Sequence, residues 1–161
     1  MIIRITDILA RKVKLRPPPH QPMHVNAFAD WSAQLLRAKR ESFVLVMNTR
    51  SLYSVIAPAS GIVTPLALEA RLFAHIKSQL YSDGLEFFCR RLLDRDGEAT
   101  LFAKMLNSRT EATLHDFSEL AQYYLGEEEL SLEATAGKIN STMLSLLDHS
   151  TPRHTFQTMG F

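Results

Sequence analysis

The chain has 161 residues, of which 46% are hydrophobic and 22% charged, and its formal net charge at pH 7 is +1. This length favours a single domain, 1–161, with a core that folds without disulfides or metals, and only one cysteine is present. No apolar run approaches the ~20 residues that span a bilayer. The N-terminus does not resemble a secretory signal, so we expect a cytoplasmic protein with no membrane partner.

Charge is distributed unevenly along the chain. Residues 1–50 carry nine Lys or Arg and three Asp or Glu, a net charge of +6. Residues 51–161 carry nine and fourteen, a net charge of −5. Such asymmetry is typical of a surface that binds nucleic acid or another anion, but two parts that pack together would cancel each other. The nearly neutral total favours cancellation.

The first thirty residues predict a strand, a helix and an arm. The β-branched run at 2–5 suits a short strand, and Thr6 can cap a helix that continues through Leu15. Prolines then remove backbone donors and fix φ, so residues 16–29 are predicted to form a Pro-rich extended linker or arm.

The next segment centres on a predicted pair of strands. Asp30 can cap a helix led by Trp31, the only tryptophan, with basic residues in its last turn. Residues 42–57 then read as two strands joined by a short polar turn at Asn48, a residue that tolerates the left-handed conformation. Their continuous apolar runs predict burial on both faces of the sheet.

Turn and cap signals divide the middle of the chain. A helix is predicted from residues 64–65, a cap followed by proline, to Gly84, which suits a left-handed helix end. Residues 85–93 fit either a helix or a strand. A turn is predicted at 94–97, and a strand at 99–106.

Two helices and a tail complete the prediction. The first runs from Asp116, which begins a capping box, to Gly126, and the second extends from Glu127 toward Leu147. Residues 148–161 are predicted to be a loop-like C-terminal tail. We therefore predict an α+β fold, with a small, largely antiparallel three- to four-stranded sheet packed with about five helices.

The sequence predicts no metal site, no cofactor and no reactive nucleophile. His20 and His24 have a helical metal-ligand spacing but lie beside prolines, where a helix is not expected. The glycines are isolated, so no phosphate-binding glycine loop is present. Cys89 stands beside Arg90 and Arg91, which could activate a thiol, but a lone cysteine after phenylalanine is more often a core residue.

Basic and amide side chains gather near the predicted strand and helix ends. They are Arg37, Arg40, Asn48, Arg50, Lys104, Asn107 and Arg109. If these ends converge, the side chains would form an anion-binding pocket of guanidinium, ammonium and amide donors. The alternative is that the ends are polar because they meet water.

Short motifs also occur in a distinctive order: residues 2–6, the tryptophan segment 31–37, the strand pair 43–54, the segment 103–110 leading into 115–117, and 138–143. In this order the chain resembles a family of small bacterial proteins described as a domain of unknown function. It departs from the pattern where Lys104-Met105 replaces Lys-Thr and where Ala112 replaces a glycine. The resemblance implies no activity, substrate or cofactor.

Three hypotheses follow from the sequence. The first is a non-enzymatic protein that binds an anionic partner, nucleic acid or a phosphorylated small molecule, through the basic and amide cluster. The second is a small enzyme acting on an anionic metabolite in the same cleft, with His115 or Asp116 as acid or base. The third is a homodimer formed through exposed apolar surface, such as Phe156, Phe161 or a sheet edge.

Overall fold

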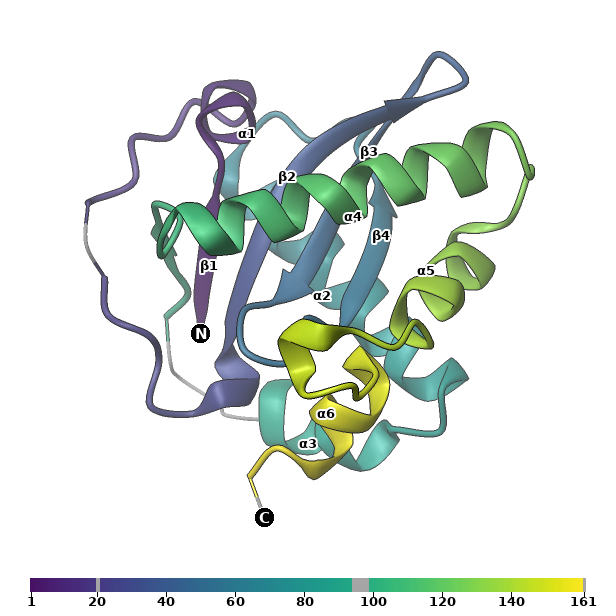
Figure 1. Ribbon diagram of the computed structural model, residues 1–161. Coiled ribbons are helices and arrows are strands. Elements are labelled where there is room, and N and C mark those ends of the chain that lie inside the picture. The colour runs from purple at the N-terminus through teal and green to yellow at the C-terminus, as the bar shows by residue number, and fades with distance from the viewer. Residues whose placement is uncertain (20, 94–98, 161) are drawn as a thin grey trace.

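Five strands form one mixed sheet that lies between two layers of helices (Figure 1). This computed structural model describes residues 1–19, 21–93 and 99–160, without the side chains of 91–93. Several features named above fall outside the described residues: His20, the side chain of Arg91, the predicted turn at 94–97, and Phe161. None of the helices in the described ranges combines the length and the apolar character that crossing a membrane requires.

The strands have the spatial order β4-β3-β2-β1-β5. Their bounds are Ile2–Ile5 (β1), Asp30–Ala38 (β2), Glu41–Asn48 (β3), Ser54–Pro58 (β4) and Leu101–Ala103 (β5). β1 is parallel to both of its neighbours, β2 and β5, whereas β2, β3 and β4 form an antiparallel run. The predicted α+β class is therefore correct, but the sheet has five strands and is mixed rather than largely antiparallel.

The predicted helix at Trp31 is wrong, because this segment forms β2. The segment is rich in Ala, Gln, Leu and Arg, which have high helix propensity. In the fold it pairs with β1 on one side and β3 on the other, with Trp31 opposite both Ile3 and Asn48. Helices cover both sheet faces, so β2 lacks the alternation of polar and apolar residues that marks a half-exposed strand.

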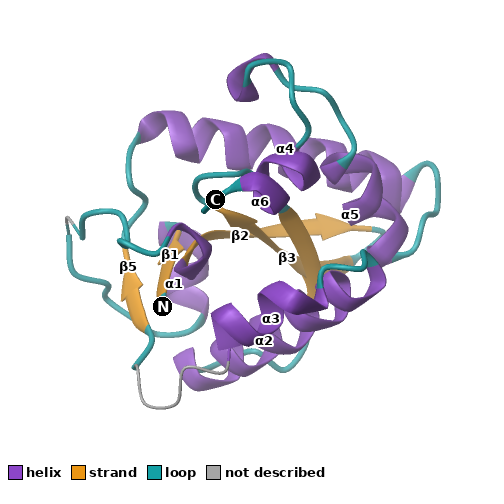
Figure 2. Cartoon of the chain, turned by 90° about the horizontal axis from the view of Figure 1, so that it is seen from below, coloured by secondary structure: helices purple, strands orange, loops and turns teal. Residues whose placement is uncertain are grey.

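The described residues contain six α-helices. They are Asp7–Lys12 (α1), Pro65–Ser82 (α2), Glu86–Leu93 (α3), Ser108–Gly126 (α4), Leu132–Asn140 (α5) and Pro152–Thr158 (α6). Two short 3₁₀ helices are also present in the described residues, Ala27–Ala29 and Ser145–Leu147. Figure 2 shows α2 and α3 on one side of the sheet and α4 and α5 on the other.

The strand pair and α2 agree with the sequence prediction. β3 and β4 form an antiparallel pair, and Thr64 Oγ1 accepts a hydrogen bond from the Ala67 amide at the start of α2. Gly84 follows the C-cap of α2 and has a φ of 70°, the left-handed conformation that commonly ends a helix. The ambiguous segment 85–93 forms α3.

Helix boundaries in the second half differ from the prediction because other caps prevail. α4 begins well before Asp116, since Asn107 Oδ1 accepts from the Thr110 amide at 2.8 Å. The next helix, α5, begins after its N-cap Ser131 rather than at Glu127, and it ends at Asn140 rather than near Leu147. The predicted loop-like tail contains α6, which Thr151 caps by accepting from the His154 amide. At the N-terminus, α1 ends at Lys12 rather than Leu15.

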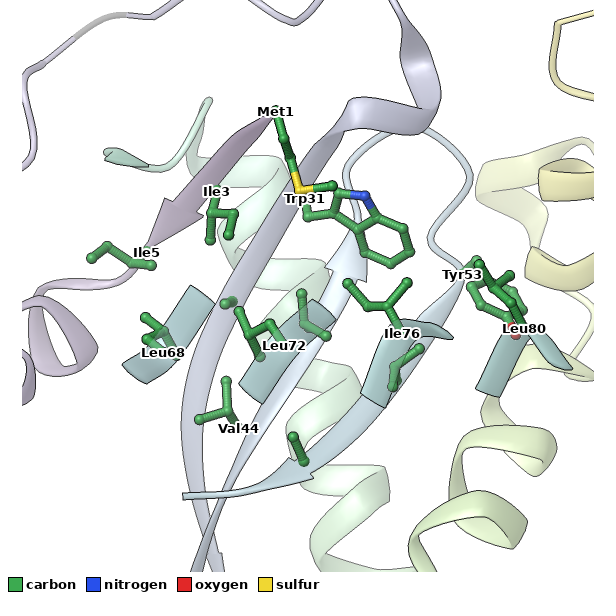
Figure 3. Close-up of a cluster of buried hydrophobic side chains, with 14 of the residues drawn as sticks. Met1, Ile3, Ile5, Trp31, Val44, Tyr53, Leu68, Leu72, Ile76 and Leu80 are labelled. Carbon is green, nitrogen blue, oxygen red and sulfur yellow. The ribbon is translucent and has the colours of Figure 1, made fainter. Parts of the chain in front are cut away.

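Two apolar clusters hold the helices to the sheet. On one face, side chains of β1, β2 and β3 such as Ile3, Trp31 and Val44 pack with Leu72 and Ile76 of α2 (Figure 3). On the other face, strand residues including Leu45, Met47 and Ile56 pack with Leu114 and Phe117 of α4. Both faces are thereby removed from water, which is the main contribution to stability.

The C-terminal helix is fixed by one aromatic side chain. Phe156 is fully buried, and its ring centroid lies 5.1 Å from that of Phe28 and 4.7 Å from that of Tyr53. The rings of Trp31 and Phe88 are also neighbours, at 6.1 and 5.5 Å. α6 is therefore docked beside α3 at one end of the sheet (Figure 1).

Candidate functional site

A cavity of about 800 Å³ opens at the end of the sheet where the proline-rich arm, the β3–β4 turn, α3 and α6 meet. Its polar lining includes Asn26, Arg50, Arg90, Thr155 and Thr158. Its apolar lining includes Val25, Phe28 and Met159. We refer to it as the arginine cavity.

The turn that presents Arg50 is built around the Asn48 side chain. Asn48 Oδ1 accepts from the Ser51 amide at 2.9 Å and from the Arg50 amide at 3.3 Å. Asn48 Nδ2 donates to the carbonyl oxygens of Ala27 at 3.0 Å and Asp30 at 3.2 Å. Asn48 is fully buried, so it positions Arg50 and the end of the arm rather than contacting a ligand.

The second arginine comes from α3. Phe88 is buried on this helix and packs against Phe28, with ring centroids 5.2 Å apart. Arg90, two residues later, is exposed and lines the cavity. Cys89 is buried, in agreement with its prediction as a core residue, with its sulfur 4.0 Å from the Lys77 carbonyl oxygen.

A buried hydrogen bond supports the wall formed by α6. The Tyr53 hydroxyl donates to Asp83 Oδ2 at 2.6 Å, beneath Phe156. Burial, reinforced by the adjacent Asp83 carboxylate, raises the pKa of Tyr53 well above its usual range. Tyr53 therefore remains a neutral donor. Arg153 of α6 lies 4.0 Å from Asp83 and ties the helix to the end of α2.

The lining of the arginine cavity is positively charged in the described part of the chain. None of the described lining residues is Asp or Glu. Arg50 and Arg90 make no side-chain hydrogen bond or ion pair with any residue that the structure describes. Two guanidinium groups in one cavity are donors suited to phosphate or carboxylate oxygens.

The structure does not bring the seven predicted side chains together. The register pairs Ala38 with Glu41 at one end of β3 and Trp31 with Asn48 at the other. Arg40, in the β2–β3 turn, and Arg50 therefore lie beyond opposite ends of β3, which spans about 23 Å at about 3.3 Å per residue. Arg37 lies near Arg40, where its carbonyl oxygen accepts from Gln122 of α4 at 3.1 Å.

The other predicted residues lie at a third place, the start of α4. Lys104 and Asn107 follow β5, and Asn107 caps the helix with its side chain. Arg109 stands thirteen positions before Gln122 in α4, and Gln122 marks the position of Arg37. The separation is about 20 Å at 1.5 Å per residue. Of the predicted set, only Arg50 lines the arginine cavity.

The acid–base candidates of the enzyme hypothesis lie elsewhere. His115 lines a separate cavity near the end of β1, and its Nε2 is 3.7 Å from Glu119 Oε1. Asp116 is exposed and does not line either cavity. The predicted shared cleft of arginines and acid–base residues is therefore not formed by the described residues.

Sequence reasoning missed Arg90 and the hydroxyl groups of α6. In the sequence, Arg90 is notable only as a neighbour of Cys89. The signal for α6 was present, because Thr151-Pro152 repeats the cap-and-proline pattern of residues 64–65. The proximity of Arg90 to Arg50 depends on aromatic packing and has no local signal.

A search of protein families matches residues 2–155 to the model described as Domain of unknown function (DUF6933), and the chain therefore belongs to this family. The match confirms the resemblance to a domain of unknown function drawn from the motif order. No curated protein and no solved structure matches the chain.

Among the described residues, no group of three or more His, Cys, Asp or Glu side chains is arranged to hold a metal ion. The arginine cavity itself has no His, Cys, Asp or Glu among its described lining residues.

Proposed function

We propose that this protein binds a small organic anion in the arginine cavity, with Arg50 and Arg90 as the anion-binding residues. The observation that carries the proposal is the pair of guanidinium groups that share this cavity and lack an acidic partner among the described residues. A guanidinium group forms two parallel hydrogen bonds to phosphate or carboxylate, so both the charge and the geometry favour such a ligand.

The remaining lining favours an anion that carries an apolar part. Val25 is almost fully exposed, and Phe28 and Met159 also line the cavity. Asn26 and Thr155 add groups that can hydrogen-bond polar atoms of the ligand. A phosphorylated or carboxylated organic molecule would use both kinds of lining, whereas inorganic phosphate would use only one.

The distribution of basic residues favours a small molecule over nucleic acid. Nucleic-acid affinity comes mainly from several Lys or Arg side chains that neutralise successive phosphates. Arg37 and Arg40 lie at the opposite end of β3 from Arg50, with Lys104 and Arg109 at a third place. The predicted basic residues are thus spread over three places, whereas Arg50 and Arg90 line one cavity.

The proposal is tested by calorimetric titration with phenyl phosphate, benzoate, inorganic phosphate and a single-stranded oligonucleotide. We expect phenyl phosphate or benzoate to bind more tightly than inorganic phosphate and to raise the melting temperature with concentration. Arg50→Ala and Arg90→Ala should each weaken binding by about tenfold or more, the loss expected for a charge-assisted hydrogen bond.

Arg40→Ala is the matched control, because it removes an exposed arginine outside the cavity and should leave affinity unchanged. The proposal fails if no organic anion binds at low salt, or if Arg50→Ala and Arg90→Ala bind as the wild type does. Oligonucleotide binding that depends on Arg37 and Arg40 would instead support the nucleic-acid hypothesis.

A further inference from the structure

Asn26 adds to the arginine cavity a side-chain donor whose direction is fixed. Its Oδ1 accepts a hydrogen bond from the Phe28 amide at 3.1 Å, so the oxygen of the carboxamide faces the 3₁₀ helix Ala27–Ala29. The Asn26 amide donates to His24 Nδ1 at 3.0 Å, which holds the backbone of this residue as well. The Nδ2 group is therefore left with two N–H donors that have no partner among the described residues.

The segment that carries Asn26 is tied to the turn that carries Arg50. The carbonyl oxygen of Ala27 accepts from Asn48 Nδ2 at 3.0 Å, and Asn48 Oδ1 accepts from the Arg50 amide at 3.3 Å. One buried side chain therefore holds both donors of the cavity wall in a fixed relation. Thr155, which is half-buried on α6, adds a hydroxyl group without a hydrogen-bond partner in the part of the chain that the structure describes.

The described lining of the arginine cavity carries two positive charges. Arg50 and Arg90 contribute one charge each, and the other described lining residues are uncharged. The two guanidinium groups come from different elements, the β3–β4 turn and α3, and each can form two parallel hydrogen bonds to an oxyanion. A ligand with a single negative charge would neutralise only one of the two arginines, whereas a doubly charged anion would balance both.

Given the proposed function, on which this step rests, we propose that the anion bound in the arginine cavity is doubly charged, a phosphomonoester or an organic dicarboxylate. A phosphomonoester carries a charge close to −2 at pH 7.5, since its second pKa is about 6. Both kinds of ligand present three or more acceptor oxygens. These are enough to accept from Arg50, Arg90 and the Asn26 Nδ2 group at the same time.

Two matched pairs of ligands test the charge by calorimetric titration at pH 7.5 and low salt. Phenyl sulfate has the shape and the terminal oxygens of phenyl phosphate but only one negative charge, and benzoate is phthalate without its second carboxylate. We expect phenyl phosphate to bind about fivefold or more tightly than phenyl sulfate, because a second charge is attracted by the second arginine. A similar preference for phthalate over benzoate would support dicarboxylates as ligands, and its absence would exclude them and leave phosphomonoesters.

Variants of the lining should change the preference between the two phenyl esters as well as the affinity. Arg90→Gln removes one of the two charges, so phenyl phosphate should lose more affinity than phenyl sulfate does. Asn26→Asp keeps an oxygen that accepts from the Phe28 amide but replaces the donor by a negative oxygen, and it should also weaken phenyl phosphate more than phenyl sulfate. Arg40→Gln, at an exposed arginine beyond the other end of β3, is the matched control and should leave both affinities unchanged.

The outcomes separate the charge of the ligand from the existence of the site. Equal affinities for phenyl phosphate and phenyl sulfate, an unchanged ratio of these affinities in Arg90→Gln, or unchanged phenyl phosphate binding by Asn26→Asp would each overturn the assignment of a doubly charged ligand. If benzoate and phenyl sulfate nevertheless bind in a way that depends on Arg50, the proposed function stands without this assignment. If none of the four ligands binds, the proposed function and the assignment both fail.

Discussion

Arg4 and Asp30 form a buried ion pair with two hydrogen bonds, from Arg4 Nε to Asp30 Oδ1 at 2.9 Å and from Arg4 Nη2 to Oδ2 at 2.8 Å. Their side chains are 1% and 0% exposed. Arg4 also donates to the carbonyl oxygens of Gln21 and Pro22, and Asp30 accepts from the His24 amide. The pair therefore attaches the proline-rich arm, whose end lines the arginine cavity, to β1 and β2.

Arg4→Met should lower the free energy of unfolding by about 3–5 kcal/mol, because it leaves the Asp30 carboxylate buried without its partner. Urea denaturation measures the loss. In the double variant with Asp30→Leu, the uncompensated charge is gone, and part of the stability should return. A loss for Arg4→Met below about 1 kcal/mol, within the range of an exposed ion pair, would contradict the buried pairing.

Phe156→Ala should destabilise the protein by about 3–5 kcal/mol, the range for removing a fully buried aromatic side chain. Phe156 packs among four other aromatic rings and holds α6 against α3. Thermal or urea unfolding checks the loss. Phe87→Ala, at a side chain that is 55% exposed, is the matched control and should have a much smaller effect. Equal effects would mean that the tail is not docked as described.

Asn140 acts in place of a missing strand at the edge of the sheet. Its Oδ1 accepts from the Ser54 amide at 2.7 Å, and its Nδ2 donates to the Ser54 carbonyl oxygen at 2.8 Å. Asn140→Ala leaves both buried groups without partners, so we expect a loss of about 2–4 kcal/mol. Faster hydrogen exchange at the Ser54 amide would identify the cause.

Asn140→Asp is the informative comparison, since an ionised carboxylate accepts from the Ser54 amide but cannot donate to its carbonyl oxygen. It should fail to restore stability. Recovery by Asn140→Asp would show that the second hydrogen bond contributes nothing.

The parts of the fold that could be predicted have local signals. The β3–β4 pair has continuous apolar runs around a polar turn, and α2 has a capping threonine followed by proline. β2 could not be predicted this way. Its residues favour a helix locally. The segment becomes a strand because it pairs with β1, which is distant in the sequence, and with β3, which follows it after a turn.

The candidate site likewise contains one residue with a local sequence signal and one whose position depends on contacts distant in the sequence. Arg50 was predicted because it adjoins the polar turn that Asn48 builds. Arg90 reaches the same cavity because Phe88 packs on Phe28 and Phe156, contacts between residues far apart in the chain. The grouping of Arg37 and Arg109 with Arg50 depends on the assumption that all strand ends converge, which the register of β2 and β3 contradicts.

His75, on α2, should make the stability of the protein depend on pH. Partial burial, and secondarily the nearby Arg71, lower the pKa of His75 below its ordinary value. Between that lowered pKa and about 6.5, the unfolded chain binds more protons at this site than the folded chain does. The contribution of His75 is therefore complete above about pH 6.5 and is lost as the pH falls through this window.

His75→Gln should remove this part of the pH dependence. The measurement is the urea midpoint at pH 7.5, 6.5 and 5.5, with the difference between wild type and variant as the readout. We expect the wild type to lose more stability than His75→Gln as the pH falls, because only the wild type must keep an imidazole neutral. His154→Gln, at an exposed histidine of α6, is the control and should follow the wild type. Parallel curves for wild type and His75→Gln would show that the environment of His75 does not discriminate between its two protonation states.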